Sequence, residues 1–454
     1  MTAEVEKIQA DLIQIRAAAL RAVDPSGAVR QYLRVSADGG VVQVGGTTWH
    51  VSPGQVILIA AGKAAAAMAD AACQVLGDAV GRGLVVTRRP LLSGPAFLPA
   101  SVQLLEAGHP VPDEAGVQAA RRAADLLTGL RPEDKVLVLL SGGASALLPL
   151  PVAGVELSDL QQLTGLLLKS GAAIQEVNAV RKHLEQLKGG QLARLAQPGQ
   201  VAALILSDVV GDPLDVIASG PTVPDSSTFG GCLDILRKYH LEERLPPGIA
   251  AHLHAGARGE MPETPKRGDA FFGAVSNAVV GSNLLAAEAA CREAGRLGYQ
   301  ALLLTTFLEG EAREVGRVAA GLARGIAQQA TPFAPPACIV CGGETTVTVR
   351  GGGQGGRNQE LALAAALGIR GMPAVGVMAL ATDGSDGPTD AAGAVVTGET
   401  ISAAAASGLD PWAALEKNDS YPFLRAAGAL MHTGPTGTNV NDLLVILVGT
   451  GDGN

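Results

Sequence analysis

One repeated junction constrains this 454-residue chain more than any other feature: an apolar strand runs into a glycine-rich or polar loop, usually followed by a helix. Such loops occur at residues 60–63, 141–145, 207–215, 351–359 and 382–390. Strands that alternate with helices build βαβ units, and successive βαβ units form α/β domains. We therefore predict an α/β fold with largely parallel sheets.

The length of the chain predicts two domains, because a single hydrophobic core stops growing at about 250–300 residues. Residues 244–270 carry proline, glycine, histidine and charge without an apolar period, which is typical of a linker. We place an N-terminal α/β domain with a Rossmann-like sheet at residues 1–255. A C-terminal α/β domain is expected at residues 270–454.

The composition argues against several classes of protein. Charged residues make up 17% of the chain and hydrophobic residues 47%, which indicates a globular rather than a disordered protein. The net charge is −9 and no run of Lys and Arg exceeds two residues, so no nucleic-acid surface is expected. Glycine and proline interrupt the apolar stretches, so no membrane span is expected either.

The cellular compartment follows from two features of the sequence. The five cysteines are odd in number and lie in apolar segments, which favours buried thiols in a reducing compartment. The N-terminus is polar and acidic and lacks the pattern of a signal peptide. We expect a cytoplasmic protein, and a homodimer is one state that the sequence leaves open.

Glycine at a strand-to-helix turn allows backbone N–H groups to approach an anion, and the helix N-terminus adds positive potential. Five such loops in one chain favour a phosphorylated or carboxylated ligand over simple tight turns. The residues assigned to ligand binding on this ground are Ser141, Gly142, Gly143 and Ser145 in one loop and Gly353, Gly355, Gly356 and Asn358 in another.

The second of these loops also fits the pattern G-x-G-x-x-G, beginning at Gly351. The match is weak, because a run of glycines satisfies many patterns. A dinucleotide site would want an acidic residue about 20 positions further on, at the end of the next strand. That strand ends in Thr382-Asp383-Gly384, inside another polar loop. A phosphate site is therefore favoured over an NAD site.

Two basic residues stand where such loops meet helices. Lys63 follows an apolar strand and begins a helix, where a cation is unfavourable unless an anion lies nearby. The alternative is a solvated lysine at a helix start. Arg357 lies at the start of the next helix after the glycine run, and its planar fork could bind phosphate or carboxylate through two hydrogen bonds.

Two groups of aspartates follow predicted strands: Asp208, Asp212 and Asp215 after one, and Asp383, Asp386 and Asp390 after another. Carboxylates at strand ends suit Mg²⁺, or a base for a hydroxyl nucleophile. Aspartate also caps helices and closes turns, so we expect only one or two of the six to be functional. Asp208 and Asp386 are the metal candidates.

Several motifs follow one another along nearly the whole chain. Those of the N-terminal half are Ser141-Gly-Gly-Ala-Ser145, Asn178-x-x-Arg-Lys-His183, Lys188-Gly-Gly190 and Ser207-Asp-Val-Val-Gly-Asp-Pro213. Those of the C-terminal half are Gly342-Gly-Glu-Thr-Thr346, Gly353-Gln-Gly-Gly-Arg-Asn-Gln-Glu360, Thr382–Asp390 and Thr438-Asn-Val-Asn-Asp442. In this order they resemble the type II glycerate kinases, or glycerate 2-kinases, whose C-terminal half contains the MOFRL region, here at about residues 336–448.

The resemblance implies ATP- and Mg²⁺-dependent phosphorylation of D-glycerate, usually to 2-phosphoglycerate, in a cleft between two α/β domains. Glycerate and a nucleotide would be the small-molecule partners. Matched by motif, Lys63, Asp208, Arg357 and Asp383 are the expected catalytic residues. Two alternatives remain: an NAD(P)H-dependent hydroxypyruvate reductase, which is an older name within this family, and a non-catalytic protein that binds a phosphorylated metabolite.

Overall fold

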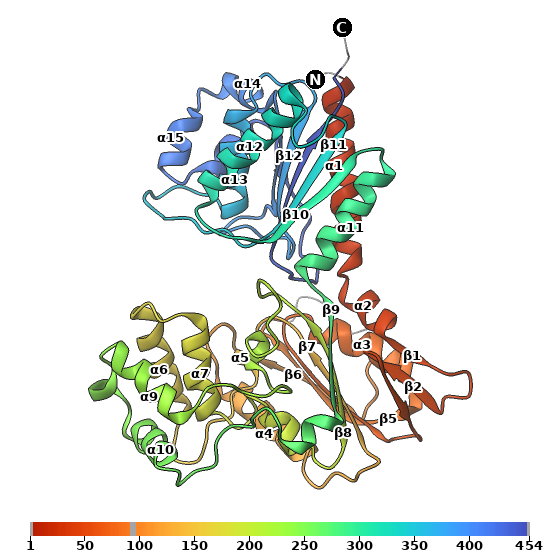
Figure 1. Ribbon diagram of the computed structural model, residues 1–454, viewed down its shortest axis with the longest axis vertical. Helices are drawn as coiled ribbons and strands as arrows, with labels where there is room; N and C mark the ends of the chain where they lie inside the picture. The colour runs from red at the N-terminus through yellow and green to blue at the C-terminus, as the bar shows by residue number, and fades with distance from the viewer. Residues whose placement is uncertain (1–2, 91–96, 452–454) are drawn as a thin grey trace. The chain divides into compact units, whose positions relative to one another are not determined.

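The computed structural model describes residues 3–90 and 97–451, and the chain divides into two compact units (Figure 1). The first unit comprises Pro25–Val280. The second unit comprises Met1–Asp24 together with Gly281–Asn454. The first helix of the chain therefore belongs to the same unit as its C-terminal half.

The first unit is built on a six-stranded sheet in the order β6-β5-β4-β7-β8-β9. Its strands are β4 (Val56–Ala61), β5 (Val80–Arg88), β6 (Val102–Ala107), β7 (Lys135–Leu140), β8 (Gln200–Leu206) and β9 (Val275–Gly281). The pairs β4–β5, β5–β6, β4–β7 and β7–β8 are all parallel. Counted within this sheet the order is 3-2-1-4-5-6, that of a Rossmann-type sheet. The predicted parallel, Rossmann-like sheet is confirmed here.

Every residue of β4 and β7 is buried, as expected for central parallel strands covered on both faces. The helices of this unit are α2 (Pro25–Tyr32), α3 (Ala65–Leu76), α4 (Glu114–Leu126), α5 (Ala144–Leu147), α6 (Leu157–Lys169), α7 (Ile174–Leu184), α8 (Gln191–Leu195), α9 (Phe229–Lys238) and α10 (Pro247–Ala257). Helices α6, α7, α9 and α10 share a separate apolar core that includes Leu163, Val180 and Leu236 (Figure 1). A small antiparallel sheet completes the unit, with β1 (Leu33–Val35), β2 (Val41–Val44) and β3 (Thr47–His50).

The second unit has a six-stranded sheet in the order β10-β11-β15-β12-β13-β14. Its strands are β10 (Gln300–Leu308), β11 (Ala337–Gly343), β12 (Val375–Ala381), β13 (Gly393–Thr397), β14 (Leu430–Met431) and β15 (Asp442–Val448). Only β10–β11 is a parallel pair, and the other four pairs are antiparallel. The prediction of a largely parallel sheet is therefore wrong for this unit. The C-terminal strand β15 inserts between β11 and β12 against their direction, and a uniformly apolar run does not reveal strand direction.

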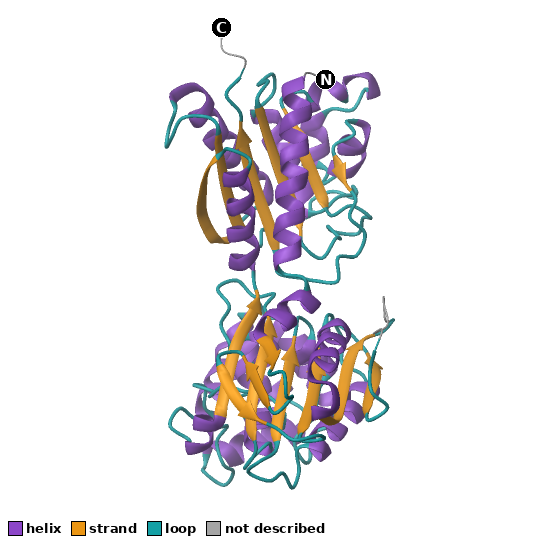
Figure 2. Cartoon of the chain, turned by 90° about the vertical axis from the view of Figure 1, so that its right-hand side faces the viewer, coloured by secondary structure: helices purple, strands orange, loops and turns teal. Residues whose placement is uncertain are grey.

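Helices cover both faces of this second sheet (Figure 2). They are α1 (Ala3–Ala22), α11 (Asn283–Arg296), α12 (Ala312–Gln329), α13 (Arg357–Gly368), α14 (Thr400–Ala403), α15 (Pro411–Glu416) and α16 (Ser420–Ala426). Helices α12 and α13 pack on the face formed by Ile339 and Val377. Helix α1 packs on the other face, where Gly376 of β12 meets Ile8. No helix within the described ranges combines the length and apolar character that crossing a bilayer requires.

The division into units differs from the predicted boundary between residues 255 and 270. Helix α1 packs so closely on β12 that a Cβ on Gly376 would lie 2.4 Å from Ile8 Cγ2. The segment expected to be a linker instead contains α10, whose Ile249 and Leu253 are buried one turn apart. Strand β9 then adds to the first sheet, and Thr222 Oγ1 donates to Asn277 Oδ1 at 2.6 Å.

We predict that Leu12→Ala will destabilise the second unit by about 2–5 kcal/mol, the usual cost of truncating a buried leucine. Leu12 is fully buried, whereas Ile13 on the same helix is 49% exposed, so Ile13→Ala is the matched control. Hydrogen exchange measured by mass spectrometry should accelerate in β12 and α11 of the Leu12 variant and stay unchanged in β4 and β7. Acceleration confined to the first sheet would contradict the assignment of α1 to the second unit.

Candidate functional site

The strand order of the first sheet reverses between β4 and β7, and open α/β sheets bind ligands outside the carboxyl ends of strands at this point. The loops that follow these two strands, residues 61–64 and 141–145, are called here the switch-point loops. Ser141 N donates to Ala61 O at 3.0 Å and Lys63 N donates to Gly142 O at 2.9 Å. Ser141 Oγ accepts from Ala64 N at 3.0 Å. The structure thus brings predicted residues of two separate loops into one assembly.

The pair Gly142–Gly143 lies at the centre of the switch-point loops. A Cβ on Gly142 would lie 2.0 Å from Asp208 Oδ2. A Cβ on Gly143, whose φ is +87°, would lie 2.8 Å from His109 Cδ2 and 3.6 Å from Lys63 Cγ. Asp208 excludes a Cβ at Gly142, and His109 together with the positive φ excludes one at Gly143, while Lys63 lies at an ordinary contact distance.

Sequence reasoning predicted Lys63 and Asp208 at this position but missed His109. The histidine lies in Gly108-His109-Pro110, directly after β6. Its signal in the sequence is a polar residue between glycine and proline at a strand end, without the glycine run or acidic cluster that marks the other loops. Burial, Lys63 and Arg88 all lower the pKa of His109. Its imidazole is therefore neutral near pH 7.

Helix α7 ties the switch-point loops to the loop that carries Asp208. Arg181 Nη2 donates to the backbone oxygen of Ser145 at 3.0 Å. Ser145 Oγ and Ser219 Oγ lie 2.9 Å apart, and Ser219 Oγ donates to Asn178 Oδ1 at 3.0 Å. Asn178 and Arg181 come from the same sequence motif, and their side chains bond to Ser219 and Ser145, which follow two different strands.

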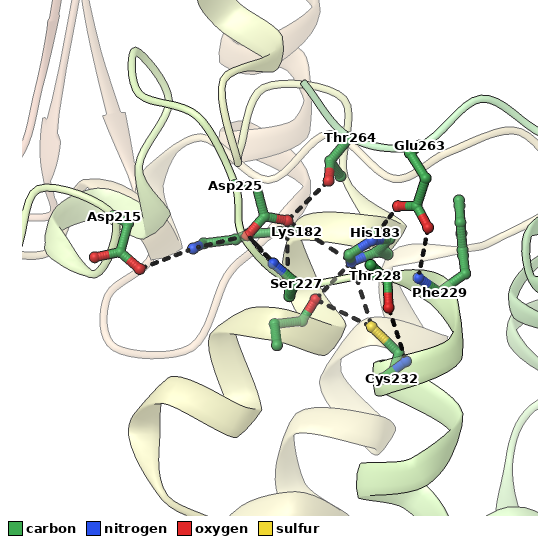
Figure 3. A network of polar contacts seen from close by, with 12 residues as sticks. Lys182, His183, Asp215, Asp225, Ser227, Thr228, Phe229, Cys232, Glu263 and Thr264 are labelled. Atoms are coloured by element: carbon green, nitrogen blue, oxygen red, sulfur yellow. Dashed lines mark hydrogen bonds and ion pairs between the residues drawn. The ribbon is translucent and has the colours of Figure 1, made fainter. Parts of the chain in front are cut away.

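A buried ion pair anchors the far end of the Asp208 loop (Figure 3). Lys182 Nζ lies 3.3 Å from Asp225 Oδ1 and 3.5 Å from Asp215 Oδ2. Ser227 Oγ and Thr264 Oγ1 each donate to Asp225 Oδ2 at 2.8 Å. Burial alone would raise the pKa of Asp225, but Lys182 and these donors outweigh it and hold the pKa below its ordinary value. Asp225 therefore stays ionised, and Lys182 fixes Asp215 at the end of the loop.

The glycines of the second predicted ligand loop pack against the protein itself. Added Cβ atoms would lie 2.5 Å from Asp419 Cβ at Gly353, 2.3 Å from Ser420 Oγ at Gly355, and 2.3 Å from Asp386 Cγ at Gly356. These contacts within the chain are enough to explain glycine at all three positions, whether or not a ligand binds there. The ligand-binding role of Gly353, Gly355 and Gly356 stays a prediction.

Asp386 accepts hydrogen bonds at the start of α13. Its Oδ1 accepts from Asn358 N at 3.1 Å and from Asn358 Nδ2 at 3.3 Å, and its Oδ2 accepts from Gln359 N at 2.8 Å. The carboxyl group is buried, which raises its pKa, while these donors oppose the rise. This geometry supports the capping interpretation over the predicted metal role, because N–H groups occupy both carboxylate oxygens. Asn358, a predicted ligand residue, thus donates to Asp386 through both its backbone N and its Nδ2.

Arg357 makes the predicted bidentate contact, but with carboxylates of its own chain. Its Nε donates to Asp442 Oδ2 at 2.5 Å and its Nη2 donates to Asp442 Oδ1 at 3.0 Å. Its Nη1 donates to Glu344 Oε1 at 2.6 Å, and Glu344 Oε2 accepts from Asn441 Nδ2 at 2.9 Å. Burial raises the pKa of Asp442 to about 6 despite the opposing effect of Arg357. Three of the five guanidinium N–H groups are therefore engaged by carboxylates.

Asp383 follows β12 and lies in the turn that sequence reasoning expected. Its Oδ1 accepts from Ser385 N at 3.0 Å, and its backbone oxygen accepts from Thr436 N at 3.3 Å. The first contact is the turn-closing role that aspartate commonly plays. The side chain is only half-buried, so the contact does not exclude a ligand on its other oxygen.

The fold and the switch-point loops define a doubly wound α/β protein whose ligand site is expected at the carboxyl edge of a parallel sheet. Comparisons with known proteins narrow this class. Residues 11–254 match the model of a domain of unknown function, DUF4147, and residues 337–442 match the MOFRL family. The second match lies within the predicted MOFRL region.

The similar proteins are named as glycerate kinases or as a putative hydroxypyruvate reductase. The chain is 44% identical over 431 residues to "Glycerate 2-kinase" of Pyrococcus horikoshii, covering 95% of each chain. It is 43% identical over 398 residues to "Putative hydroxypyruvate reductase" of Agrobacterium vitis, covering 87% of this chain and 88% of the relative. A crystal structure of glycerate kinase from Thermotoga maritima superposes with a TM-score of 0.87 at 43% identity, covering 98% of this chain and 100% of that one. The chain belongs to the glycerate 2-kinase family, as its motifs predicted.

We predict that Arg357→Ala will lower the free energy of unfolding of the second unit by about 2 kcal/mol at pH 8, because it leaves the buried Asp442 carboxylate without its partner. The cost should be clearly smaller at pH 5, since the pKa of Asp442 is about 6 and its carboxyl group is then largely protonated. A raised carboxyl pKa favours the folded state at low pH, and this advantage disappears as the pH rises through 6.

Hydrogen exchange of α13 and β15 at both pH values measures this cost. Arg317→Ala is the matched control, because its pair with Glu314 is 55% exposed on both sides and should contribute under about 0.5 kcal/mol. An equal cost for Arg357→Ala at both pH values would show that Asp442 does not control the stability of this cluster.

Proposed function

We propose that this chain catalyses the ATP-dependent phosphorylation of D-glycerate to 2-phosphoglycerate. The observation that carries the proposal is the convergence of Lys63 and Asp208 on the glycine pair of the switch-point loops. Relatives that match nearly the full length of the chain bear the names glycerate 2-kinase and glycerate kinase. The free thiols of all five cysteines agree with a cytoplasmic location, which belongs to the same proposal.

Phosphoryl transfer depends mainly on positioning and on neutralising charge. Lys63 begins the loop after β4 and is the proposed cation for the transferring phosphoryl group. Gly142, Gly143, Ser141 and Ser145 would hold the phosphates of ATP close to the backbone, as glycine loops do.

Asp208 is the proposed Mg²⁺ ligand of the first unit. Mg²⁺ bound with a nucleotide commonly takes one or two protein carboxylates, with phosphate oxygens and water completing its shell. Across residues 3–90 and 97–451, no group of three His, Cys, Asp or Glu side chains could hold a metal. A single carboxylate above a glycine loop fits the requirement of a nucleotide-bound Mg²⁺, which would supply charge neutralisation for the phosphates.

Arg357 and Asp383 are the proposed catalytic residues of the second unit. The contacts with Asp442 and Glu344 fix the plane of the Arg357 guanidinium, so its remaining N–H groups would meet an anion in a defined orientation. Asp383 would orient the glycerate hydroxyl or bind Mg²⁺. Asp383→Asn separates these roles, because only a metal ligand would weaken Mg²⁺-dependent nucleotide binding.

The NAD(P)H-dependent hydroxypyruvate reductase remains the second candidate, because a similar protein bears that name. The geometry argues against its proposed dinucleotide loop. Gly355 and Gly356 face Ser420 and Asp386 rather than an open surface. A non-catalytic binding protein would need the glycine loops but not the convergence of a lysine and a carboxylate on them.

We predict that the purified protein will release ADP only when D-glycerate, ATP and Mg²⁺ are all present. A coupled assay measures ADP, and product analysis distinguishes 2-phosphoglycerate from 3-phosphoglycerate. No NADH should be oxidised in the presence of hydroxypyruvate. Robust NADH turnover without ATP would instead support the reductase, and binding without any turnover would support the non-catalytic alternative.

We predict that Lys63→Ala will lower kcat at least about 100-fold, the scale of losing one preorganised charge contact to the transferring group. The melting temperature should hardly change, since Lys63 lies at the edge of the sheet and contributes little to the core. Lys169→Ala, in the exposed last turn of α6, is the control and should keep the wild-type rate. A normal rate in the Lys63 variant would instead support the alternative that Lys63 is a solvated lysine at the start of a helix.

A further inference from the structure

Three loops of the first unit place side chains around the Gly142–Gly143 pair, and one of these side chains has no role in the function proposed above. His109 Nε2 lies 2.9 Å from the point that a Cβ would occupy on Gly143, and its Cδ2 lies 2.8 Å from the same point. Lys63 Cγ lies 3.6 Å from that point, and Asp208 Oδ2 lies 2.0 Å from the equivalent point on Gly142. Because adjacent Cα atoms are only about 3.8 Å apart, imidazole, lysine stem and carboxylate surround one small region.

The hydrogen bonding of His109 differs from that of the other partly or fully buried histidines of this unit. His183 contacts Ala179 O through Nδ1 at 2.8 Å and Glu263 Oε2 through Nε2 at 3.0 Å. His252 Nε2 lies 3.0 Å from His183 O. Over residues 3–90 and 97–451, by contrast, no hydrogen bond or ion pair engages the ring of His109. A half-buried imidazole with both nitrogens available is unusual for a purely structural histidine, since buried polar groups normally have partners.

We propose that His109 is a further catalytic residue, whose Nε2 contacts the acceptor hydroxyl of the substrate beside Lys63 and takes up its proton. This inference rests on the kinase function proposed above. It assigns proton acceptance to a side chain of the first unit and leaves Asp208 available for Mg²⁺.

In the proposed step, proton transfer to His109 accompanies phosphoryl transfer from ATP. The hydroxyl oxygen of D-glycerate forms a bond to the γ-phosphorus of ATP while the bond from that phosphorus to the ADP oxygen breaks, and its electron pair leaves with ADP. The hydroxyl proton forms a bond to the lone pair of His109 Nε2. The imidazolium then returns the proton to water before the next turnover.

The charges around His109 favour a ring that begins the step without a proton. Burial, Lys63 and Arg88 lower the pKa of the imidazole. Asp113 lies close to Gly108, the residue before His109: a Cβ on Gly108 would be 3.0 Å from the carboxyl carbon of Asp113. The carboxylate of Asp113 already accepts a hydrogen bond from Gly116 N at 3.0 Å and lies 3.6 Å from Arg89 Nη1. Asp208 lies beside the neighbouring glycine, with its Oδ2 2.0 Å from the point that a Cβ would occupy on Gly142.

The test compares His109→Gln, His109→Ala and the control His252→Gln. Glutamine keeps polarity and hydrogen bonding but cannot take up a proton, so His109→Gln should lower kcat about 100-fold and leave the KM for D-glycerate within about threefold. Added imidazole should restore part of the kcat of His109→Ala by entering the space that the ring vacates. His252→Gln changes a ring of the same unit that lies outside the switch-point loops, and it should keep the wild-type kcat.

Near-normal kcat in His109→Gln, or no rescue by imidazole when His109→Ala is folded but slow, would overturn the proposal. A second measurement separates this failure from failure of the kinase function. Diethyl pyrocarbonate should modify His109 in the wild-type protein, and D-glycerate with Mg²⁺ and a non-hydrolysable ATP analogue should protect it at least fivefold. Protection without ADP release would reject the kinase function but keep His109 in a ligand site, and the absence of protection would reject the His109 proposal.

Discussion

The parallel pairing of β4 with β7 determines where the functional groups of the first unit can lie. The two strands end level with each other, with Ala61 opposite Leu140, and the backbone bonds of the switch-point loops continue the pairing beyond the sheet. A Cβ on Gly62 would lie only 2.2 Å from Ser141 Oγ. Because the loops pack this closely, a shift of either strand by one residue would separate Lys63 from Gly143. The site therefore depends on strand register as much as on the side chains that act in it.

The charged groups of helix α7 that support these loops are held by several partners. Lys182 lies between Asp225 and Asp215, and each carboxylate oxygen of Asp225 also accepts from Ser227 Oγ at 2.8 Å. Removing one partner of a buried ion pair is strongly destabilising, because it leaves an uncompensated buried charge. This cost makes α7 a rigid support for the loops, since moving Lys182 would leave Asp225 buried and unpaired.

The sequence allowed the first unit to be predicted better than the second. Loops after apolar strands made Lys63 and Asp208 candidates, and the structure brings both to one glycine pair, because parallel strands place their carboxyl ends at one edge. His109 escaped because a single histidine after a short strand has no periodicity or cluster to mark it. In the second unit, β15 is the last strand in sequence but a central one in space, and pairing between segments so distant leaves no local signal. Helix α1 was misassigned for the same reason, since its partner β12 lies more than 350 residues later.

The two glycine loops show why one sequence pattern can have two physical causes. At Gly142 and Gly143 the atoms that exclude a Cβ belong to Asp208 and His109, polar side chains whose reactive groups surround the space above the backbone. At Gly353 and Gly355 they belong to the Lys417–Ser420 segment, and at Gly356 to Asp386, so close packing of the chain accounts for the glycines. The motif G-x-G-x-x-G is satisfied by the second loop, yet the first is the loop that we propose as the ligand site. What distinguishes them is the chemistry of the neighbouring atoms, and that chemistry comes from strands far apart in the sequence.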